Sequence, residues 1–262
     1  MSPRPPSFPR GHLQAEAVPR PVSALADSLE RGAVIPPHSH ERSQLIFATS
    51  GAMSVRTARG YWLLPASHAL WMPAGVTHQI RANGRVEMRT LYVQRAHARQ
   101  VGDECRVIFV SPLLRELIVR AMQLPALYDE RGMEGRLMAL ILDEVARLPA
   151  QPLGLRMPGD PRLLRLCERL LEDLSITESV ARLGAVVGLS ERSVMRLFLK
   201  ETGLSFRRWH NQARLLRAFE LFERGDSLTQ IALEVGYSGP SAFAKMFRRT
   251  LGKSPSALRA LH

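Results

Sequence analysis

One pattern occurs twice in the C-terminal third of the chain: SVARLGAVVGLS at residues 179–190 and SLTQIALEVGYS at residues 227–238. Each copy begins with serine, places two aliphatic residues four positions apart, and ends in glycine, one further residue and serine. Residues four apart lie on one face of a helix, glycine favours a tight turn, and serine caps the next helix. Gly184 and Ala232 are small enough for that helix to pack closely. The repeat therefore predicts two helix-turn-helix units, a motif whose second helix enters the major groove of DNA.

The second helix of each predicted unit is expected at residues 191–202 and 240–251. Val194, Phe198 and Phe243 have the spacing of inward-facing positions. Basic and hydroxylic side chains remain for the outer faces, where they suit contacts with phosphates and base edges. The predicted DNA-contacting residues are Ser190, Glu191, Arg192, Ser193, Arg196, Lys200, Ser238, Gly239, Ser241, Lys245 and Arg249.

A single connecting helix is predicted between the two units, over residues 206–223. Its apolar face carries Trp209, Leu216 and Phe219. A rigid connector would hold both second helices on one face of the duplex, in major grooves about 34 Å apart. The polar side of the connector carries three arginines: Arg207, Arg214 and Arg217.

Charge is concentrated in the same part of the chain. The formal net charge is +12, and residues 182–262 contribute +8 of it, from 14 basic and 6 acidic side chains. This distribution favours a polyanionic partner such as double-stranded DNA. A hydrophobic content of 45% fits a globular protein rather than a disordered one. Two cysteines, Cys105 and Cys167, are too few for a disulfide framework, and no apolar run has the length of a membrane span. We therefore expect a cytoplasmic protein without a membrane partner.

The segment IALEVGYSGPSAFAKMFRRTLGKSP, residues 231–255, closely matches a known C-terminal signature. On this basis, residues 160–259 resemble the DNA-binding domain of the AraC/XylS family of bacterial transcriptional regulators. The resemblance implies a DNA-binding domain over residues 160–262, with helix-turn-helix units at about 179–202 and 227–251. It also implies a homodimer that binds two adjacent turns of DNA, contacts RNA polymerase, and activates or represses transcription.

The sequence changes character upstream of that domain. Residues 1–20 contain five prolines and are expected to form a flexible arm. Residues 21–100 contain short apolar or β-branched runs separated by glycine, proline and Asn-Gly turns, which is typical of an antiparallel barrel or sandwich. Helical spacing follows in residues 105–150, and the proline- and glycine-rich residues 151–159 indicate a linker. Strands are expected at 44–49, 52–58, 61–64, 69–72, 78–81 and 86–93, and helices at 112–122 and 134–148.

Four polar residues of the predicted β domain, His38, His40, Gln44 and His78, have the spacing of the two cupin motifs. Side chains two apart in a strand share a face, so His38, His40 and Gln44 can point the same way, with His78 on a facing strand. Three imidazoles and an amide oxygen suit zinc, nickel, iron or copper better than magnesium. Gln44 stands where cupins have a carboxylate, so the set could instead line a pocket for a small-molecule effector. The other histidines are expected on the surface or satisfied in the core: His12, His68, His97, His210 and His262.

These patterns predict an α+β protein of two domains. The N-terminal domain is a cupin-like antiparallel β-barrel with a helix pair, and the C-terminal domain is an all-α double helix-turn-helix. The expected function is a sequence-specific DNA-binding transcriptional regulator whose cupin domain senses a small molecule or metal. The helical segment 105–150 would mediate dimerisation or signal transfer, and the resemblance implies a neighbouring exporter or metabolic gene as target.

Two other functions remain compatible with the sequence. One is a cupin-type metal-dependent enzyme with an appended helical domain. The histidine set supports it, but no general acid or base stands in motif spacing, and no catalytic residue is predicted. The other is a nucleoid-type protein that binds DNA without sequence preference. Turnover of candidate substrates would identify the enzyme, and competition by unrelated DNA would identify the nucleoid-type protein.

Overall fold

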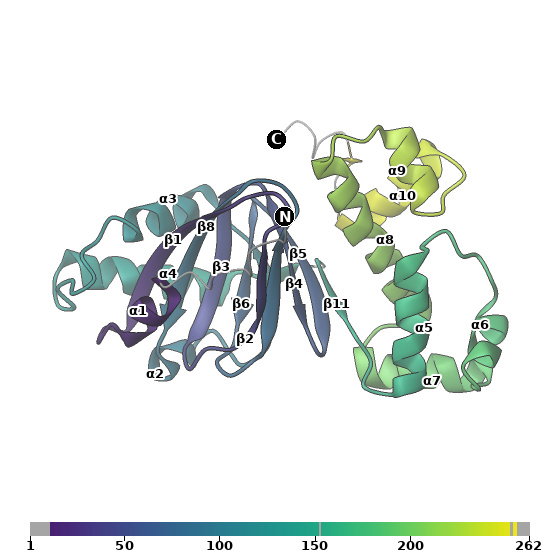
Figure 1. Cartoon of the computed structure of the whole chain (residues 1–262), viewed down its shortest axis with the longest axis horizontal. Helices are drawn as coiled ribbons and strands as arrows, with labels where there is room; N and C mark the ends of the chain where they lie inside the picture. The colour runs from purple at the N-terminus through teal and green to yellow at the C-terminus, as the bar shows by residue number, and fades with distance from the viewer. Residues whose placement is uncertain (1–10, 152, 252–253, 256–262) are drawn as a thin grey trace, which may run out of the picture. The chain divides into compact units, whose positions relative to one another are not determined.

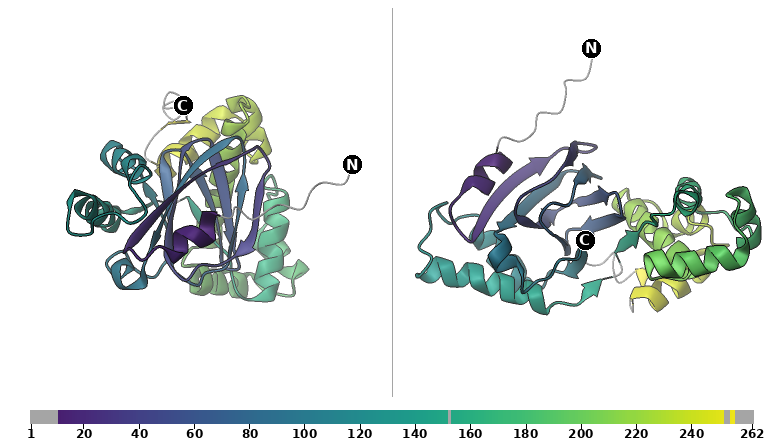
Figure 2. Two further views of the ribbon diagram at one scale, coloured as in Figure 1. Left: turned by 60° about the vertical axis from the view of Figure 1, so that its left-hand side comes forward. Right: turned by 90° about the horizontal axis from the view of Figure 1, so that it is seen from below.

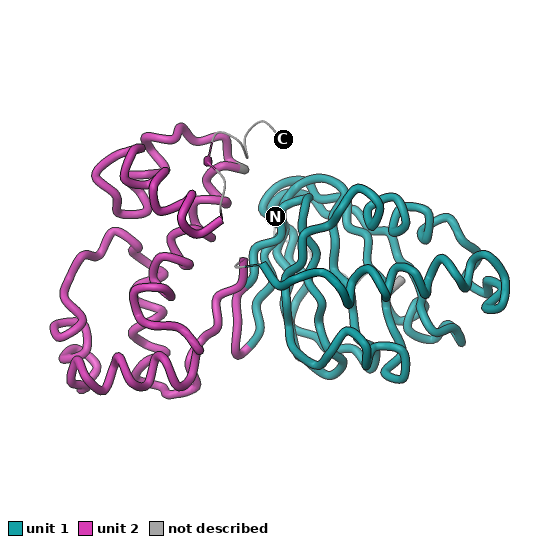
Figure 3. Tube along the Cα trace, turned by 180° about the vertical axis from the view of Figure 1, so that it is seen from behind, with its two compact units in different colours: residues 1–57, 62–151 teal, residues 58–61, 152–262 magenta. Residues whose placement is uncertain are grey.

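The computed structural model describes residues 11–151, 153–251 and 254–255 of the chain (Figure 1). It contains two compact units, coloured separately in Figure 3. Among the described residues, no helix is both long and apolar enough to cross a membrane. The first unit comprises residues 1–57 and 62–151, and the second comprises residues 58–61 and 152–262.

The first unit is built on two sheets (Figure 2). The larger sheet contains β1 (Val22–Leu29), β3 (Ser43–Ser50), β6 (His68–Met72), β8 (Val86–Val93), β9 (Arg106–Phe109) and β10 (Ala150–Gln151). Its strand order is β1-β8-β3-β6-β9-β10, and all neighbouring strands are antiparallel. The central strand β3 is buried along most of its length, so this sheet forms the middle of the unit.

The smaller sheet of this unit has the strand order β5-β4-β7-β2 and includes one edge strand with prolines. Its strands are β2 (Val34–His38), β4 (Ala52–Thr57), β5 (Gly60–Pro65) and β7 (His78–Ala82). β2 contains Pro36 and Pro37. Proline has no N–H to donate to a neighbouring strand, so it is tolerated at a sheet edge and not in a central strand. The edge position of β2 therefore accommodates the two prolines that precede His38.

Helices cover one face of the larger sheet. These are α3 (Pro112–Ala121) and α4 (Met133–Arg147), which contact each other, while the short α2 (Arg95–Ala98) follows β8 (Figure 2). Phe47 and Leu91 of the sheet belong to one buried cluster with Ile118 of α3 and Ile141 of α4. Because side chains alternate along a strand, the neighbours of Phe47 and Leu91 point to the opposite face, between the two sheets.

The second unit is helical apart from one short strand. α8 is its central element and contacts α7, α9 and α10, while α6 packs on α7 and α9 on α10. Its fully buried aromatic side chains are Trp209, Phe198, Phe243 and Phe247. Its elements are β11 (Gly154–Arg156), α5 (Pro161–Glu172), α6 (Val180–Val186), α7 (Glu191–Thr202), α8 (Phe206–Glu223), α9 (Leu228–Glu234) and α10 (Pro240–Leu251).

The two-domain α+β fold is confirmed, with differences in detail. Residues 11–17 of the expected flexible arm form the helix α1 (Gly11–Ala17), which contacts β1, while residues 1–10 lie outside the described part of the chain. β9 belongs to the larger sheet although it falls in the expected helical segment, because its apolar residues complete the sheet beside β6. The expected linker contains β11.

Candidate functional site

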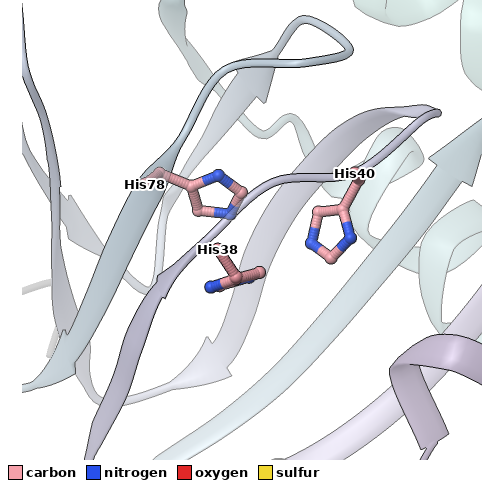
Figure 4. Close-up of side chains that lie close together, drawn as sticks. All are labelled: His38, His40 and His78. Carbon is pink, nitrogen blue, oxygen red and sulfur yellow. The ribbon is translucent and has the colours of Figure 1, made fainter.

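Three histidines converge in the first unit, and we call His38, His40 and His78 the histidine cluster (Figure 4). His38 ends β2, His78 begins β7, and the two are partners in the strand register. His40 lies two residues beyond His38, in the connection to β3. One ring nitrogen from each histidine lies within 4.8 Å of the others. The structure thus brings together the three histidines selected by motif spacing, although His40 stands outside the strand.

Backbone carbonyls fix the tautomers of two rings in the histidine cluster. Nδ1 of His38 lies 2.7 Å from the carbonyl oxygen of Pro36, and Nδ1 of His78 lies 2.9 Å from that of Val76. A carbonyl oxygen only accepts hydrogen bonds, so each Nδ1 carries the proton and donates it. The lone pair of each neutral ring therefore resides on Nε2. Metal-binding histidines have the same arrangement, with the other ring N–H donated to a carbonyl or carboxylate.

In His40, the partner of the ring Nδ1 is a carboxylate instead of a backbone carbonyl. Its Nδ1 pairs with Glu16 of α1, whose side chain is 19% exposed. The Nε2 atoms of His40 and His78 are buried, and neither has a hydrogen-bond partner among the described residues. Buried polar atoms without partners are rare, and they commonly indicate a ligand, ion or water. The cluster thus has the donor atoms and the outer hydrogen bonds of a metal site.

Burial keeps these rings neutral. Burial, together with the neighbouring histidines, lowers the pKa of His40 to about 3. Burial also lowers the pKa of His78 to about 4, and it lowers the pKa of His38. At neutral pH all three rings therefore present lone pairs, which suit a cation or a hydrogen-bond donor.

Gln44 lies on β3 and faces the histidine cluster from the other sheet. Its amide nitrogen donates to Thr90 Oγ1 at 2.9 Å and to the hydroxyl of Tyr92 at 3.4 Å. Its carbonyl oxygen is buried and has no hydrogen-bond partner among the described residues. The side chain is neutral, so it adds no negative charge to the site.

The motif spacing did not include two residues of α1 that reach this region. His12 was expected on the surface or satisfied in the core; it is 3% exposed, and its Nδ1 bonds to the hydroxyl of Tyr92. Glu16 pairs with His40. The available signal was the i, i+4 spacing of His12 and Glu16, which places both on one face of a helix.

In the second unit, α6 and α7 form the first helix-turn-helix. The turn contains Gly188 with φ of 71°, a left-handed conformation that favours glycine. Ser190 caps α7, its hydroxyl oxygen accepting from the backbone N–H of Ser193 at 3.2 Å. A Cβ on Gly184 would lie 2.6 Å from the carbonyl oxygen of Leu189, so the expected close packing of the helices is confirmed there.

The second helix of each unit buries its apolar face and exposes its polar face. Val194 and Phe198 of α7, and Phe243 and Phe247 of α10, are fully buried. Of the predicted DNA-contacting residues, Ser193 and Gly239 are half-buried. The exposed ones are Ser190, Glu191, Arg192, Arg196, Lys200, Ser238, Ser241, Lys245 and Arg249.

α7 also exposes two apolar side chains that the sequence reasoning did not select. Met195 is 53% exposed and Leu199 is 59% exposed. They lie beside the predicted reading residues, and apolar side chains there suit contact with thymine methyl groups. The signal was their position on the helix, outside the spacing of Val194 and Phe198.

The arginines of α8 divide into two kinds. Arg214 donates from Nε to the carbonyl oxygen of Leu174 at 3.0 Å, and its guanidinium carbon lies 5.2 Å from the centroid of the Tyr237 ring. Arg217 forms ion pairs with Glu220 and Glu234. Both therefore hold the unit together. The exposed Arg207 lines a groove of about 610 Å³ between α8 and α10, with Asn211, Arg214, Lys245 and Arg249.

Two family models match the chain. The model described as a helix-turn-helix domain matches residues 183–260, and the model described as an AraC-like ligand binding domain matches residues 21–199. The second match spans more than half of the chain. The chain belongs to the AraC family of transcriptional regulators. In this AraC-family protein, the double helix-turn-helix is the DNA-binding domain and the β unit belongs to the ligand-binding domain.

Several individual proteins are similar to this chain. The AraC-family chain is 31% identical to the HTH-type transcriptional regulator NimR of Escherichia coli, over 84% of this chain and 80% of NimR. It is 30% identical to the HTH-type transcriptional regulator RipA of Corynebacterium glutamicum, over 42% of this chain and 32% of RipA. Among solved structures, ToxT from Vibrio cholerae aligns with 92% of this chain and 99% of the ToxT chain, at 10% identity and a TM-score of 0.40.

Proposed function

We propose that this regulator reads two adjacent major grooves of double-stranded DNA with α7 and α10. The observation that carries this proposal is the exposure of basic side chains at matching positions of the two copies, as for Arg196 and Lys245. α8 has 18 residues and therefore measures about 27 Å, at 1.5 Å per residue. A rod of that length supports placing α7 and α10 in successive grooves about 34 Å apart.

We further propose that the histidine cluster is the sensor, with a divalent transition metal as its effector. Three neutral imidazoles with anchored Nδ1 atoms suit zinc, nickel, iron or copper. A small organic molecule is the alternative effector. In either case the effector must bind more tightly to one conformation of the protein. A ligand with equal affinity for two conformations does not change the equilibrium between them.

The regulator would act as a homodimer that contacts RNA polymerase, and as a sensor rather than an enzyme. The helix pair α3 and α4 supports self-association, because it exposes the apolar side chains of Leu113, Met133 and Leu140. Binding to chromosomal DNA would place the protein in the cytoplasm.

The test uses the full chain and the DNA upstream of its own and neighbouring genes. Footprinting should show two protected major-groove segments about one helical turn apart, and unrelated DNA should compete poorly. Added Zn²⁺, Ni²⁺ or Co²⁺ should change operator affinity relative to protein kept in chelator. Equal competition by unrelated DNA would contradict sequence-specific reading, and an affinity indifferent to these metals would contradict metal sensing.

A further inference from the structure

A fourth histidine, His12 of α1, lies next to the histidine cluster. Its ring centroid is 6.1 Å from that of His40 and 6.3 Å from that of His38. Within the cluster the corresponding distances run from 4.3 Å to 5.4 Å, so His12 is only slightly farther away. It is 3% exposed, although it belongs to the first helix described in the chain.

The hydrogen bonds of His12 follow the pattern of the cluster. Its Nδ1 bonds to the hydroxyl of Tyr92, while its Nε2 is buried and has no hydrogen-bond partner among the described residues. The phenol oxygen can accept from Nδ1, which leaves the Nε2 lone pair for a ligand. Gln44 donates to the same phenol oxygen and so helps to hold it in place.

α1 is held in this position by contacts outside the cluster. The hydroxyl of Ser23 on β1 donates to the carbonyl oxygen of Ala15 at 2.6 Å. Arg42 donates to the carbonyl oxygen of Arg20 at 2.9 Å and so fixes the chain that follows α1. The helix therefore presents His12 and Glu16 to the site before any ligand binds.

We propose that His12 is the fourth ligand of a divalent transition metal held by the Nε2 atoms of His38, His40 and His78. This inference rests on the metal-sensing part of the proposed function. In this assignment the imidazole of His12 is the fourth ligand, at a site where Gln44 replaces the carboxylate ligand of the cupin motif. Glu16 and Tyr92 are the outer partners that orient His40 and His12.

The geometry is close to what such a metal requires. Zinc binds histidine nitrogens at about 2.0–2.1 Å, which sets tetrahedral nitrogens about 3.3 Å apart. The nitrogens of the histidine cluster already lie within 4.8 Å of one another. These three rings and His12 would therefore have to move closer together when the metal binds. Four neutral nitrogen donors favour zinc, copper, nickel or iron over magnesium and calcium.

The test measures metal binding by the full chain, prepared in chelator and then titrated with Zn²⁺ or Co²⁺. We expect one metal per chain and a Co²⁺ absorption spectrum of four nitrogen ligands. His12→Ala should weaken binding by more than about tenfold, since loss of an outer partner alone costs about 10–100-fold. The His12→Ala spectrum should also shift. His97→Ala, which changes an exposed histidine, is the matched control and should bind like the unaltered chain.

A second variant keeps the test informative if His12→Ala disturbs folding. Tyr92→Phe retains the His12 ring but removes its hydroxyl partner, and it should weaken Zn²⁺ binding by about 10–100-fold. An unchanged affinity and Co²⁺ spectrum in His12→Ala would overturn the fourth-ligand assignment while leaving the three-histidine site intact. If His78→Ala also bound metal normally, the metal-sensing part of the proposed function would itself be wrong.

Discussion

His38 and His78 face each other across the β2–β7 strand pair, with ring centroids 4.3 Å apart. The register of this pair shifts between Ile35 and His38, which marks a bulge in β2. Bulges change the direction of side chains and occur often beside functional sites. The bulge thus brings the His38 ring over His78 in a strand whose prolines would otherwise weaken its pairing.

Metal binding should stabilise the folded protein. A ligand that binds only the folded state adds about 2.7 kcal/mol of stability when its free concentration is 100 times its Kd. We expect Zn²⁺ to raise the Tm of the full chain in a concentration-dependent way, as measured by differential scanning fluorimetry. His38→Ala should abolish the rise and His97→Ala should retain it. The same rise in His38→Ala would place the metal elsewhere.

Arg196→Ala and Lys245→Ala should each weaken binding to the footprinted operator, by about 1–3 kcal/mol if the side chain reads a base. Both side chains are exposed on the reading helices. Fluorescence anisotropy at several salt concentrations separates base reading from phosphate contact, because a lost phosphate contact reduces the salt dependence. The control is Arg224→Ala, which removes the same charge from an exposed position after α8. Operator affinity unchanged in both test variants would show that α7 and α10 do not read DNA.

Gly184→Ala should destabilise the second unit by about 1–3 kcal/mol, the usual cost of overpacking. The added Cβ would lie 2.6 Å from the carbonyl oxygen of Leu189 and 3.0 Å from Cγ2 of Val194. A backbone carbonyl cannot move without opening the turn. Gly239→Ala is the matched control in the same unit, because its Cβ would meet no heavy atom within 4 Å. In urea unfolding, Gly184→Ala should therefore have a lower midpoint than Gly239→Ala. Equal midpoints would contradict the tight α6–α7 packing.

His210 should make the stability of the second unit depend on pH. Burial, together with the adjacent Arg214, lowers its pKa to about 4. In the unfolded chain the histidine pKa is about 6.5. Between about pH 4 and about pH 6.5, His210 is therefore protonated in the unfolded state and neutral in the folded state. Stability from this group is thus complete above about pH 6.5 and falls toward pH 4, by up to about 1.4 kcal/mol per pH unit.

The check is urea unfolding of the full chain and of His210→Gln between pH 7 and pH 4. Glutamine does not titrate, so the variant should lose less stability on acidification. Parallel pH profiles for the two proteins would show that folding does not lower the pKa of His210.

The sequence could predict the strands of β3 to β8 because their apolar alternation is bounded by glycine, proline and Asn-Gly turns. The helix-turn-helix units could be predicted because both copies repeat the same caps and turns. β2 was not predicted as a strand, since Pro36 and Pro37 argue against any strand except one at a sheet edge, and edge position is a property of the assembled sheet. β9 was not predicted, because it has only four residues and precedes a segment with helical spacing. Its pairing with β6 depends on tertiary packing.

For the candidate site, motif spacing could select His38, His40, Gln44 and His78 because they lie in or beside neighbouring strands. It could not select His12, whose partner Tyr92 is 80 positions away in the sequence. A contact of that span depends on how α1 packs on the larger sheet. The helix α1 was not predicted, because the start of the chain is rich in proline. The exposure of Met195 and Leu199 could have been predicted, because both fall outside the inward spacing of Val194 and Phe198.

Arg214 links Leu174, which precedes the first copy of the duplicated motif, to Tyr237, which lies in the second copy. One guanidinium thus connects two segments that are far apart in the sequence. Cutting the chain between the two copies would leave this guanidinium with only one of its two partners. Substitutions on the exposed faces of α7 and α10 leave these contacts of Arg214 intact, whereas a substitution of Arg214 itself removes both.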